Sequence, residues 1–238
     1  MLPLLDPFNP SEPFPDTNLA QDEPNGLLAI GGCLSTERLL NAYRHGIFPW
    51  YSEGEPILWW TPNPRLIIYP EKLKISKSLR KTIRKREFEI TFDHAFSEVM
   101  DQCSLPRGDD EGTWISKEIK QAYVALHKKG HAHSVEAWQE GNLVGGLYGV
   151  SIGSLFFGES MFSHISNASK VAFATLVTQL HEANFKLIDC QVRTEHLVSL
   201  GAEEISRELF SQHLEEFCQI SPSNNIWDKP AATNASDI

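Results

Sequence analysis

Three apolar, strand-like runs follow one another in the second half of this chain, and they restrict its possible folds more than any other feature. The runs are HSVEAWQ, LVGGLYGV and SIGSLFFGES, which start at His133, Leu143 and Ser151. Glu140-Gly141-Asn142 joins the first two, and a short polar segment that contains glycine is typical of a β-hairpin. Strands joined by such turns pair antiparallel. We therefore predict an α+β fold, in which helices pack against an antiparallel-rich sheet.

Serine start signals precede three helical segments. Serine is favoured at the position just before a helix because its side chain accepts a hydrogen bond from a free backbone N–H in the first turn. Ser35 is expected to start a short helix that ends near Gly46, Ser76 a basic helix, and Ser116 a helix that ends at Gly130. A long helix is expected from about Asn167 to Ala183, followed by the strand KLIDCQV. The tail from about Ser221 is polar and rich in Pro and Asn, and we expect it to be disordered.

The charge of the chain is unevenly distributed. The whole chain has a net charge of −10. The window 65–86 holds nine basic residues and one acid, so it carries +8 and the rest carries −18. The usual explanation of such a run is a solvated helix face, but this one is unusually one-sided, and a dense positive patch on an acidic protein is typical of a local polyanion site. The residues expected to bind a nucleic-acid backbone are Lys72, Lys74, Lys77, Arg80, Lys81, Arg84, Lys85 and Arg86.

Two polar positions interrupt apolar strands. Asp189 and Gln191 lie two residues apart in KLIDCQV, so a regular strand places both side chains on one face, with Cys190 on the other. A carboxylate in the middle of a strand is costly unless it is paired or faces a cleft. Asp189 is therefore either a structural hydrogen-bond acceptor or part of a reacting site. Glu159 and Met161, at the end of another apolar run, also share a face, so Glu159 is either a strand-end carboxylate that reaches solvent, which is the commoner case, or an acid beside a flexible apolar lining.

Several function classes lack their signals in this sequence. The chain contains no GxSxG, HExxH or phosphate-binding glycine loop. Four scattered cysteines indicate reduced thiols rather than disulfides or a zinc site. The histidines, His131 and His133 among them, have no carboxylate or cysteine partner at ligand spacing, and we expect no metal. The first ten residues lack a basic segment and a long apolar run, so we expect no secretory signal. We therefore expect a cytoplasmic protein.

Ten stretches of the chain together resemble the leucyl/phenylalanyl-tRNA–protein transferase family. They are PNGLLAIGG, LSTERLLNAYRHGIFPWY, PILWWTPNPR, GTWIS, HSVEAW, LVGGLYGV, FFGESMFS, NASK, LIDCQV and HLVSLGAEEISR, in family order from about Phe14 to Phe217. Cys33 departs from the family pattern, which usually has Asp in GGDLS at this position.

The resemblance implies an organisation and a reaction. It implies a small N-terminal domain (1–63), an acetyltransferase-like (GNAT-type) catalytic domain that includes the basic helix (64–220), and a tail (221–238). The reaction would move leucine or phenylalanine from aminoacyl-tRNA to the N-terminal amine of proteins that begin with Arg or Lys, which marks them for degradation. The tRNA ester is already activated, so no cofactor is expected. The expected partners are aminoacyl-tRNA and acceptor proteins, with no membrane, and the chain is expected to be a monomer.

The resemblance also implies roles for particular residues. Asp189 and Gln191 match the family's catalytic residues, which orient the amine and relay its proton, with Asp189 as a base or as an electrostatic guide. Glu159 matches an acidic residue that could attract the cationic acceptor. The pocket for the aminoacyl side chain would comprise Trp50, Trp114, Leu147, Phe156, Met161, Phe173, Leu176, Leu180 and Ile188. Plain core packing would explain such apolar residues equally well. Phe156 and Ile188 also have the wrong strand parity for this pocket, which would require a bulge near Gly158 or a pocket that wraps over a strand.

Two rival functions would use parts of the same pattern. An acetyl-CoA-dependent acetyltransferase should have a glycine-rich loop before the long helix, but SMFSHISNASK contains no glycine. A non-catalytic module that reads basic N-termini or binds tRNA would need only Glu159 and the basic helix. Neither rival requires Asp189, Gln191 and an apolar pocket together.

Overall fold

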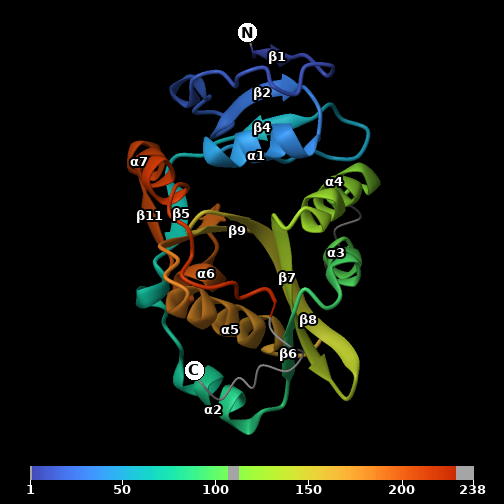
Figure 1. Ribbon diagram of the computed structural model, residues 1–238, viewed down its shortest axis with the longest axis vertical. Helices are drawn as coiled ribbons and strands as arrows, with labels where there is room; N and C mark the ends of the chain where they lie inside the picture. Colours follow the sequence, from blue (N-terminus) through green and yellow to red (C-terminus); the bar gives the residue numbers. More distant parts are fainter. Residues whose placement is uncertain (1, 107–112, 229–238) are drawn as a thin grey trace.

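The computed structural model describes residues 2–106 and 113–228, which form two β-sheets surrounded by helices (Figure 1). The smaller sheet has the strand order β1-β2-β4-β3, and the larger one β11-β5-β10-β9-β8-β7-β6. The strands are β1 (Leu4–Leu5), β2 (Leu27–Gly31), β3 (Phe48–Pro49), β4 (Leu58–Trp60), β5 (Arg65–Ile68), β6 (Glu89–Phe92), β7 (Ala132–Gln139), β8 (Asn142–Ile152), β9 (Leu155–Ser163), β10 (Leu187–Gln191) and β11 (Glu203–Ile205).

The helices begin where the serine signals predicted. Ser35, Ser76 and Ser116 each accept a hydrogen bond from a backbone N–H in the first turn of the helix that follows. The α-helices are α1 (Thr36–Arg44), α2 (Lys77–Lys85), α3 (Phe96–Cys103), α4 (Lys117–Lys128), α5 (Ala168–Glu182), α6 (Glu195–Ser199) and α7 (Arg207–Phe217). Two short 3₁₀ helices span Thr17–Leu19 and Pro70–Lys72.

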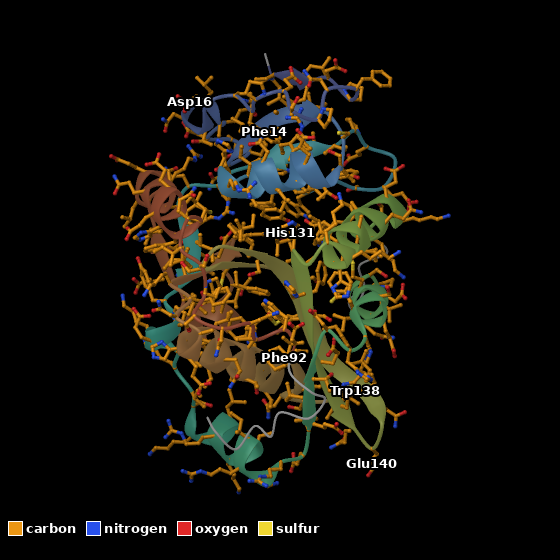
Figure 2. All side chains as sticks on the ribbon, in the orientation of Figure 1. Phe14, Asp16, Phe92, His131, Trp138 and Glu140 are labelled. Carbon is orange, nitrogen blue, oxygen red and sulfur yellow. The ribbon has the colours of Figure 1, made fainter. Side chains whose placement is uncertain are left out.

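The larger sheet is antiparallel except at one pair of strands. The hairpin between β7 and β8 turns at Glu140 and Gly141, whose φ angles are 52° and 76°, and its tip projects from the molecule (Figure 2). Positive φ at both central residues is the geometry of a tight two-residue hairpin turn. β9 and β10 pair parallel because α5 connects them. The predicted α+β fold with an antiparallel-rich sheet is therefore confirmed.

Helices cover both faces of the larger sheet. The apolar residues of α5 and α2 form one buried cluster with Leu147, Phe156 and Ile188. Residues of α1, α3, α4 and α7 form the other cluster with Tyr148 and Phe157, whose side chains point to the opposite face. This second cluster also contains Trp59 of the smaller sheet, so the two sheets share a core.

The elements at the two ends of the long axis differ in character. The smaller sheet and α1 lie at one end, and α2 lies at the other, beyond α5 (Figure 1). α2 packs against the protein through Leu79 and Ile83, which are both 3% exposed, and its lysines and arginines are exposed. Leu79 and Ile83 are four residues apart, so they form a narrow apolar stripe on one face of an otherwise basic helix.

The C-terminal segment differs from the expectation of a disordered tail, as far as it is described. Residues 221–228 fold back over the larger sheet, where Ile226 is buried and the Trp227 ring stacks on His133 with the ring centroids 4.0 Å apart. The prediction was wrong here because one isoleucine and one tryptophan supply enough apolar contact to hold an otherwise polar segment. Residues 229–238 lie outside the described residues.

Within residues 2–106 and 113–228, no helix is both long enough and apolar enough to cross a membrane.

Candidate active site

A cavity opens where β9 and β10 separate. The two strands pair from Leu187 opposite Leu155 to Asp189 opposite Phe157, and then both continue without pairing to each other. The space between them leads to a cavity of about 410 Å³, which we call the β9–β10 cavity. A separation of parallel strands exposes groups from the middle of a sheet, so polar residues of the strands can face a ligand there.

Two bulges set the direction of the polar side chains. Glu159 is an extra residue in β9, because Tyr148 pairs with Ser160 and Gly149 with Gly158. Cys190 is similarly extra in β10, and Gln191 after it has a left-handed φ of 61°. A bulge changes the face to which the following residues point. The regular alternation expected across Asp189, Cys190 and Gln191 was therefore wrong, whereas the bulge required near Gly158 is present.

The bulge in β9 explains one glycine. A Cβ atom on Gly149, which lies beside the bulge, would be 2.2 Å from the Phe157 carbonyl oxygen and 2.5 Å from the Phe156 ring. No side chain fits at these distances, so glycine is required where the two strands change register.

The cavity collects most of the residues predicted for the site, but not all of them. Those that line it are Trp114, Leu147, Phe156, Glu159, Met161, Phe173, Ile188, Asp189 and Gln191. Leu176 and Leu180 are fully buried in the core and are not among the residues that line the cavity. Trp50 lines a neighbouring cavity of about 890 Å³ together with Trp60, and Trp114 borders both cavities.

Asp189 is paired with a buried arginine. Arg65 Nε lies 2.8 Å from Asp189 Oδ1 and Arg65 Nη2 lies 2.6 Å from Oδ2, so both carboxylate oxygens accept from one guanidinium. Both residues are buried, and the guanidinium lies between the rings of Phe48 and Phe210. Sequence analysis counted Arg65 in the basic window 65–86, but β5 places it in the core. Of the two interpretations of Asp189, the contacts therefore match the structural hydrogen-bond acceptor, because both oxygens of the buried carboxylate accept from Arg65.

Gln191 connects this ion pair to Glu159. Its backbone N–H donates to Asp189 Oδ1 over 2.9 Å, and its side-chain Nε2 donates to Glu159 Oε1 over 2.9 Å. The positive φ of Gln191 is therefore fixed from both sides, by the ion pair behind it and by the carboxylate in the cavity. Asp189 reaches the polar groups of the cavity through Gln191.

Two tyrosines that sequence analysis did not assign to the site complete the surroundings of Glu159. Tyr43 of α1 donates to Oε1 over 2.8 Å, Tyr123 of α4 donates to Oε2 over 2.9 Å, and the two hydroxyls also contact each other. Both rings lie on the buried faces of their helices, but nothing in the sequence pattern indicates that their hydroxyls meet. A tyrosine in a buried stripe is itself a weak signal, because its hydroxyl needs a partner.

Burial dominates the acid–base properties of these groups. It raises the pKa of Glu159 from 4.5 to about 7; the Asp189 charge also raises it, whereas the two tyrosine hydrogen bonds and Arg65 oppose the increase. Burial, followed by the Glu159 charge, raises the pKa values of Tyr43 and Tyr123 well above that of an ordinary tyrosine. Glu159 is therefore a carboxyl group that can both accept and release a proton near neutral pH.

Two more titratable groups line the cavity. Cys190 was expected to point into the core, but as the extra residue of a bulge it faces the cavity, and burial raises the pKa of its thiol. A thiol of this kind is a poor nucleophile. His196 of α6 was not identified from the sequence. Burial and the charge of Lys170 lower the pKa of its ring.

The basic residues predicted to bind a polyanion are all exposed. One face of α2 presents Lys77, Arg80, Lys81, Arg84 and Lys85 around a shallow surface hollow, and we call this group the basic face. In the described part of the chain, only Lys72 and Lys85 of the basic run form ion pairs, with Glu203 and Glu87.

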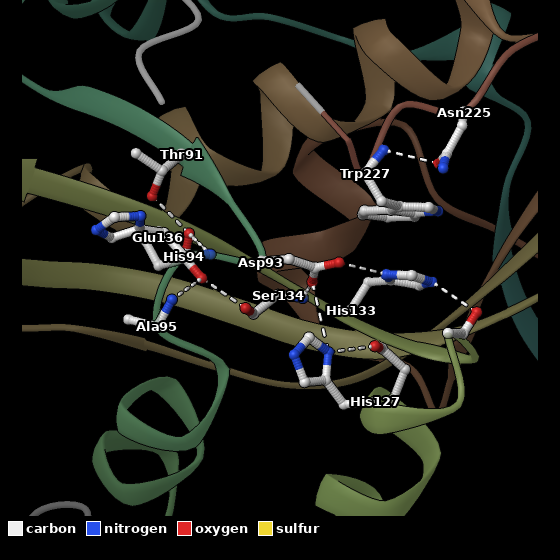
Figure 3. A network of polar contacts seen from close by, with 12 residues as sticks. Thr91, Asp93, His94, Ala95, His127, His133, Ser134, Glu136, Asn225 and Trp227 are labelled. Atoms are coloured by element: carbon white, nitrogen blue, oxygen red, sulfur yellow. Dashed lines mark hydrogen bonds and ion pairs between the residues drawn. The ribbon is translucent and has the colours of Figure 1, made fainter. Parts of the chain in front are cut away.

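A second polar network lies beneath the C-terminal segment (Figure 3). His133 Nδ1 lies 2.6 Å from Asp93 Oδ2, and His133 Nε2 lies 3.2 Å from the Gly130 carbonyl oxygen. His127 approaches the other Asp93 oxygen at 3.8 Å. Sequence analysis expected no carboxylate partner for His133, but the turn after β6 supplies Asp93. These three residues have donor atoms within 4.8 Å of one another, as a metal site does, and their contacts serve equally as a hydrogen-bond network that fixes the segment.

Comparisons with known proteins agree along almost the whole chain. A family model described as leucyl/phenylalanyl-tRNA protein transferase matches residues 67–215, and the model of that family's N-terminal domain matches residues 32–63. A leucyl/phenylalanyl-tRNA–protein transferase from Cellvibrio japonicus is 56% identical over 219 residues, which cover 92% of either chain. The protein of the same name from Methylococcus capsulatus is 52% identical over 227 residues, or 95% of this chain and 97% of the other.

Solved structures give a weaker comparison. One of the matches is a ribosomal-protein-alanine N-acetyltransferase from Brucella melitensis, with 17% identity, a TM-score of 0.32, and coverage of 61% of this chain and 98% of the other. A similarity at this level carries no argument about activity.

Proposed function

This chain belongs to the leucyl/phenylalanyl-tRNA–protein transferase family, and from that membership we propose that it transfers leucine or phenylalanine from aminoacyl-tRNA to the N-terminal amine of an acceptor protein. We further propose that the acceptors begin with Arg or Lys and that the transfer marks them for degradation. The observation that carries the proposal is the β9–β10 cavity, which is apolar on one side and has a carboxylate and an amide on the other.

The apolar side of the cavity suits the side chain of the transferred amino acid. Leu147, Phe156, Met161, Phe173 and Ile188 converge on it from three strands and α5. Burial of a leucine side chain contributes about 1.5–3 kcal/mol, and the flexible Met161 can adapt to a larger phenylalanine ring. These residues support selection for large apolar side chains and against small or charged ones.

The polar side of the cavity suits the reacting groups. Glu159 places negative charge where a cationic N-terminus would enter, and Gln191 offers a neutral amide that can orient an amine or an ester carbonyl. Because Arg65 occupies both oxygens of Asp189, we assign Asp189 the role of an electrostatic guide that holds Gln191.

The basic face of α2 suits the donor. Exposed lysines and arginines that lack acidic partners can neutralise phosphates, and the release of counterions makes such binding strongly dependent on salt. We propose that this face, with Lys72, Lys74 and Arg86 beside it, contacts the tRNA backbone while the 3′ end reaches the cavity.

Transfer of labelled leucine tests the proposal. The protein is mixed with radiolabelled Leu-tRNA and a protein that begins with Arg, and the label in the protein fraction is followed. We expect transfer to this acceptor, and none to the same acceptor with an acetylated N-terminus. Label transferred from acetyl-CoA but not from Leu-tRNA would indicate an acetyltransferase. Binding of both partners without transfer would indicate a recognition module, and either result would overturn the proposal.

A further inference from the structure

Glu159, Tyr43 and Tyr123 form a closed ring of polar contacts. Tyr43 contacts Glu159 Oε1 at 2.8 Å, Tyr123 contacts Oε2 at 2.9 Å, and the two hydroxyl oxygens contact each other. Both tyrosines are fully buried. The ring therefore has three contacts between oxygen atoms, and each contact needs one hydrogen atom to be a hydrogen bond.

The number of hydrogen atoms in the ring depends on the state of Glu159. Each tyrosine hydroxyl supplies one hydrogen, so the two tyrosines satisfy two of the three contacts. When Glu159 is a carboxylate, both hydroxyls donate to it, and the contact between the tyrosine oxygens has no hydrogen. When Glu159 is protonated, it donates to Tyr43, Tyr43 donates to Tyr123, and Tyr123 donates back to Oε2. The protonated state supplies a hydrogen to every contact of the ring, so Glu159 can take up a proton without losing its contacts to the two tyrosines.

We propose that Glu159 is the proton acceptor of the transfer reaction and takes a proton from the N-terminal ammonium of the acceptor protein. Asp189 is then a positioning residue, which acts through Gln191. This inference rests on the proposed function and adds to the charge attraction already assigned to Glu159.

The step conserves atoms and charge. The ammonium passes one proton to the Glu159 carboxylate, which leaves a neutral amine and a carboxylic acid. The amine nitrogen attacks the ester carbonyl, the new C–N bond forms, and the bond from the carbonyl carbon to the ribose oxygen breaks. That oxygen takes the second proton lost by the nitrogen and becomes a hydroxyl. Glu159 then releases its proton to solvent, so each transfer releases one proton overall.

The acidity of Glu159 matches this task. An N-terminal ammonium has a pKa of about 7.7–8.0, and the pKa of Glu159 is raised to about 7. The transfer of the proton is then unfavourable by only about tenfold. An ordinary glutamate, with a pKa of about 4.3, would make it unfavourable by several-thousandfold.

The contacts of Asp189 argue against it as the acceptor. A proton on either oxygen would break a bond to Arg65 and leave a guanidinium buried between two phenylalanine rings without its counterion. Such an uncompensated buried charge is strongly unfavourable. Glu159 forms no ion pair in the described part of the chain, and it is one of the residues that line the cavity.

Glu159→Gln tests whether Glu159 accepts a proton or only attracts the cation. The variant keeps the size of the side chain and one hydrogen-bond acceptor but has no carboxylate. With saturating aminoacyl-tRNA, we expect kcat for transfer to fall by about 10²–10⁴-fold. A rise in the KM of the acceptor with kcat unchanged would show that Glu159 only attracts the cation, and would overturn the proposal. Wild-type protein that transfers no leucine would instead overturn the proposed function itself, so the two failures are distinguishable.

Tyr123→Phe supplies a test with Glu159 in place. Its hydroxyl favours the carboxylate, so its loss raises the pKa of Glu159. The acid limb of the pH profile of kcat should move to higher pH with the same acceptor protein, so the shift belongs to the enzyme and not to the amine. Tyr69→Phe, which removes a hydroxyl bonded to His213 away from the cavity, should leave the profile unchanged. An unmoved profile in Tyr123→Phe would contradict the proposal.

Discussion

The β9–β10 cavity and the basic face of α2 hold their charges in opposite ways. In and behind the cavity, Arg65 and Asp189 are fully buried and bonded to each other, and Glu159 is enclosed by two tyrosines and a glutamine. On α2, the lysines and arginines are exposed, and most of them have no acidic partner in the described residues.

The difference separates two kinds of electrostatic function. Charges held in a rigid, buried arrangement act strongly on a reacting group but are costly to disturb. Exposed charges act weakly one by one and add up over a polyanion. We infer that the cavity determines the rate of the reaction and α2 determines the affinity for tRNA. The predictions below test this division, from the largest expected effect to the smallest.

The largest effect is expected from Asp189→Asn. The variant leaves the buried Arg65 guanidinium without a counterion, so the free energy of unfolding should fall by about 3–5 kcal/mol, as measured by urea denaturation. The matched surface change is Lys85→Met, which breaks a pair with Glu87 whose side chains are 56% and 39% exposed. It should cost less than about 1 kcal/mol. Equal losses of unfolding free energy in the two variants would contradict the contrast between buried and exposed charges. The double variant Arg65→Met/Asp189→Asn should recover part of the loss.

The next effect concerns pH. The pKa of Glu159 is raised on folding from 4.5 to about 7, so the folded protein binds more protons than the unfolded chain between these values. The contribution of Glu159 to stability is therefore present below about pH 4.5 and decreases as the pH rises to about 7, by roughly 3 kcal/mol in total. Glu159→Gln removes this dependence. The unfolding free energies of wild type and variant are measured at pH 5 and pH 8. From pH 5 to pH 8, the unfolding free energy of the variant should rise relative to that of the wild type. A constant difference would refute the raised pKa.

A smaller effect separates cavity lining from core. Met161→Ala should change the preference between leucine and phenylalanine by about 1–3 kcal/mol, measured as the ratio of kcat/KM for the two aminoacyl-tRNAs. Leu176→Ala, at a fully buried position of α5, should lower the unfolding free energy by about 2–5 kcal/mol and leave that ratio unchanged. A changed kcat/KM ratio in Leu176→Ala would show that Leu176 contacts the aminoacyl side chain.

The smallest effect on the folded protein is expected on α2. Changing Lys81, Arg84 and Lys85 to Glu should leave the melting temperature nearly unchanged, because these side chains are exposed. It should weaken tRNA binding and flatten its dependence on salt. Binding titrations at low and high salt measure both quantities, and equal slopes for variant and wild type would show that tRNA binds elsewhere.

Local sequence signals predicted the elements of this fold well. Serine caps, helical periodicity and the Glu140-Gly141 turn depend on residues close together in the chain, and each was found where predicted. Trp227 was not predicted to pack, because its partners His133 and Phe156 are far away in the sequence.

The candidate site depends more on long-range contacts, and its prediction was correspondingly uneven. The residues expected from the resemblance largely meet in one cavity. The partners that determine their chemistry, Arg65, Tyr43 and Tyr123, come from other elements, and no local pattern indicates that they meet at the site. The two bulges also reverse strand parity, so regular alternation misplaced Cys190. Similar arguments from alternation will fail wherever a strand changes register at a functional site.

A single-turnover measurement tests the division between cavity and basic face most directly. The rate of leucine transfer is measured at saturating aminoacyl-tRNA for Gln191→Asn and for the triple α2 variant. Asn tolerates the left-handed φ at position 191, but its shorter side chain cannot reach Glu159. We predict that Gln191→Asn binds tRNA normally and transfers leucine about 10²–10⁴-fold more slowly. The α2 variant should reach nearly the wild-type rate once tRNA saturates it. A slow α2 variant at saturation, together with a fast Gln191→Asn, would contradict the account.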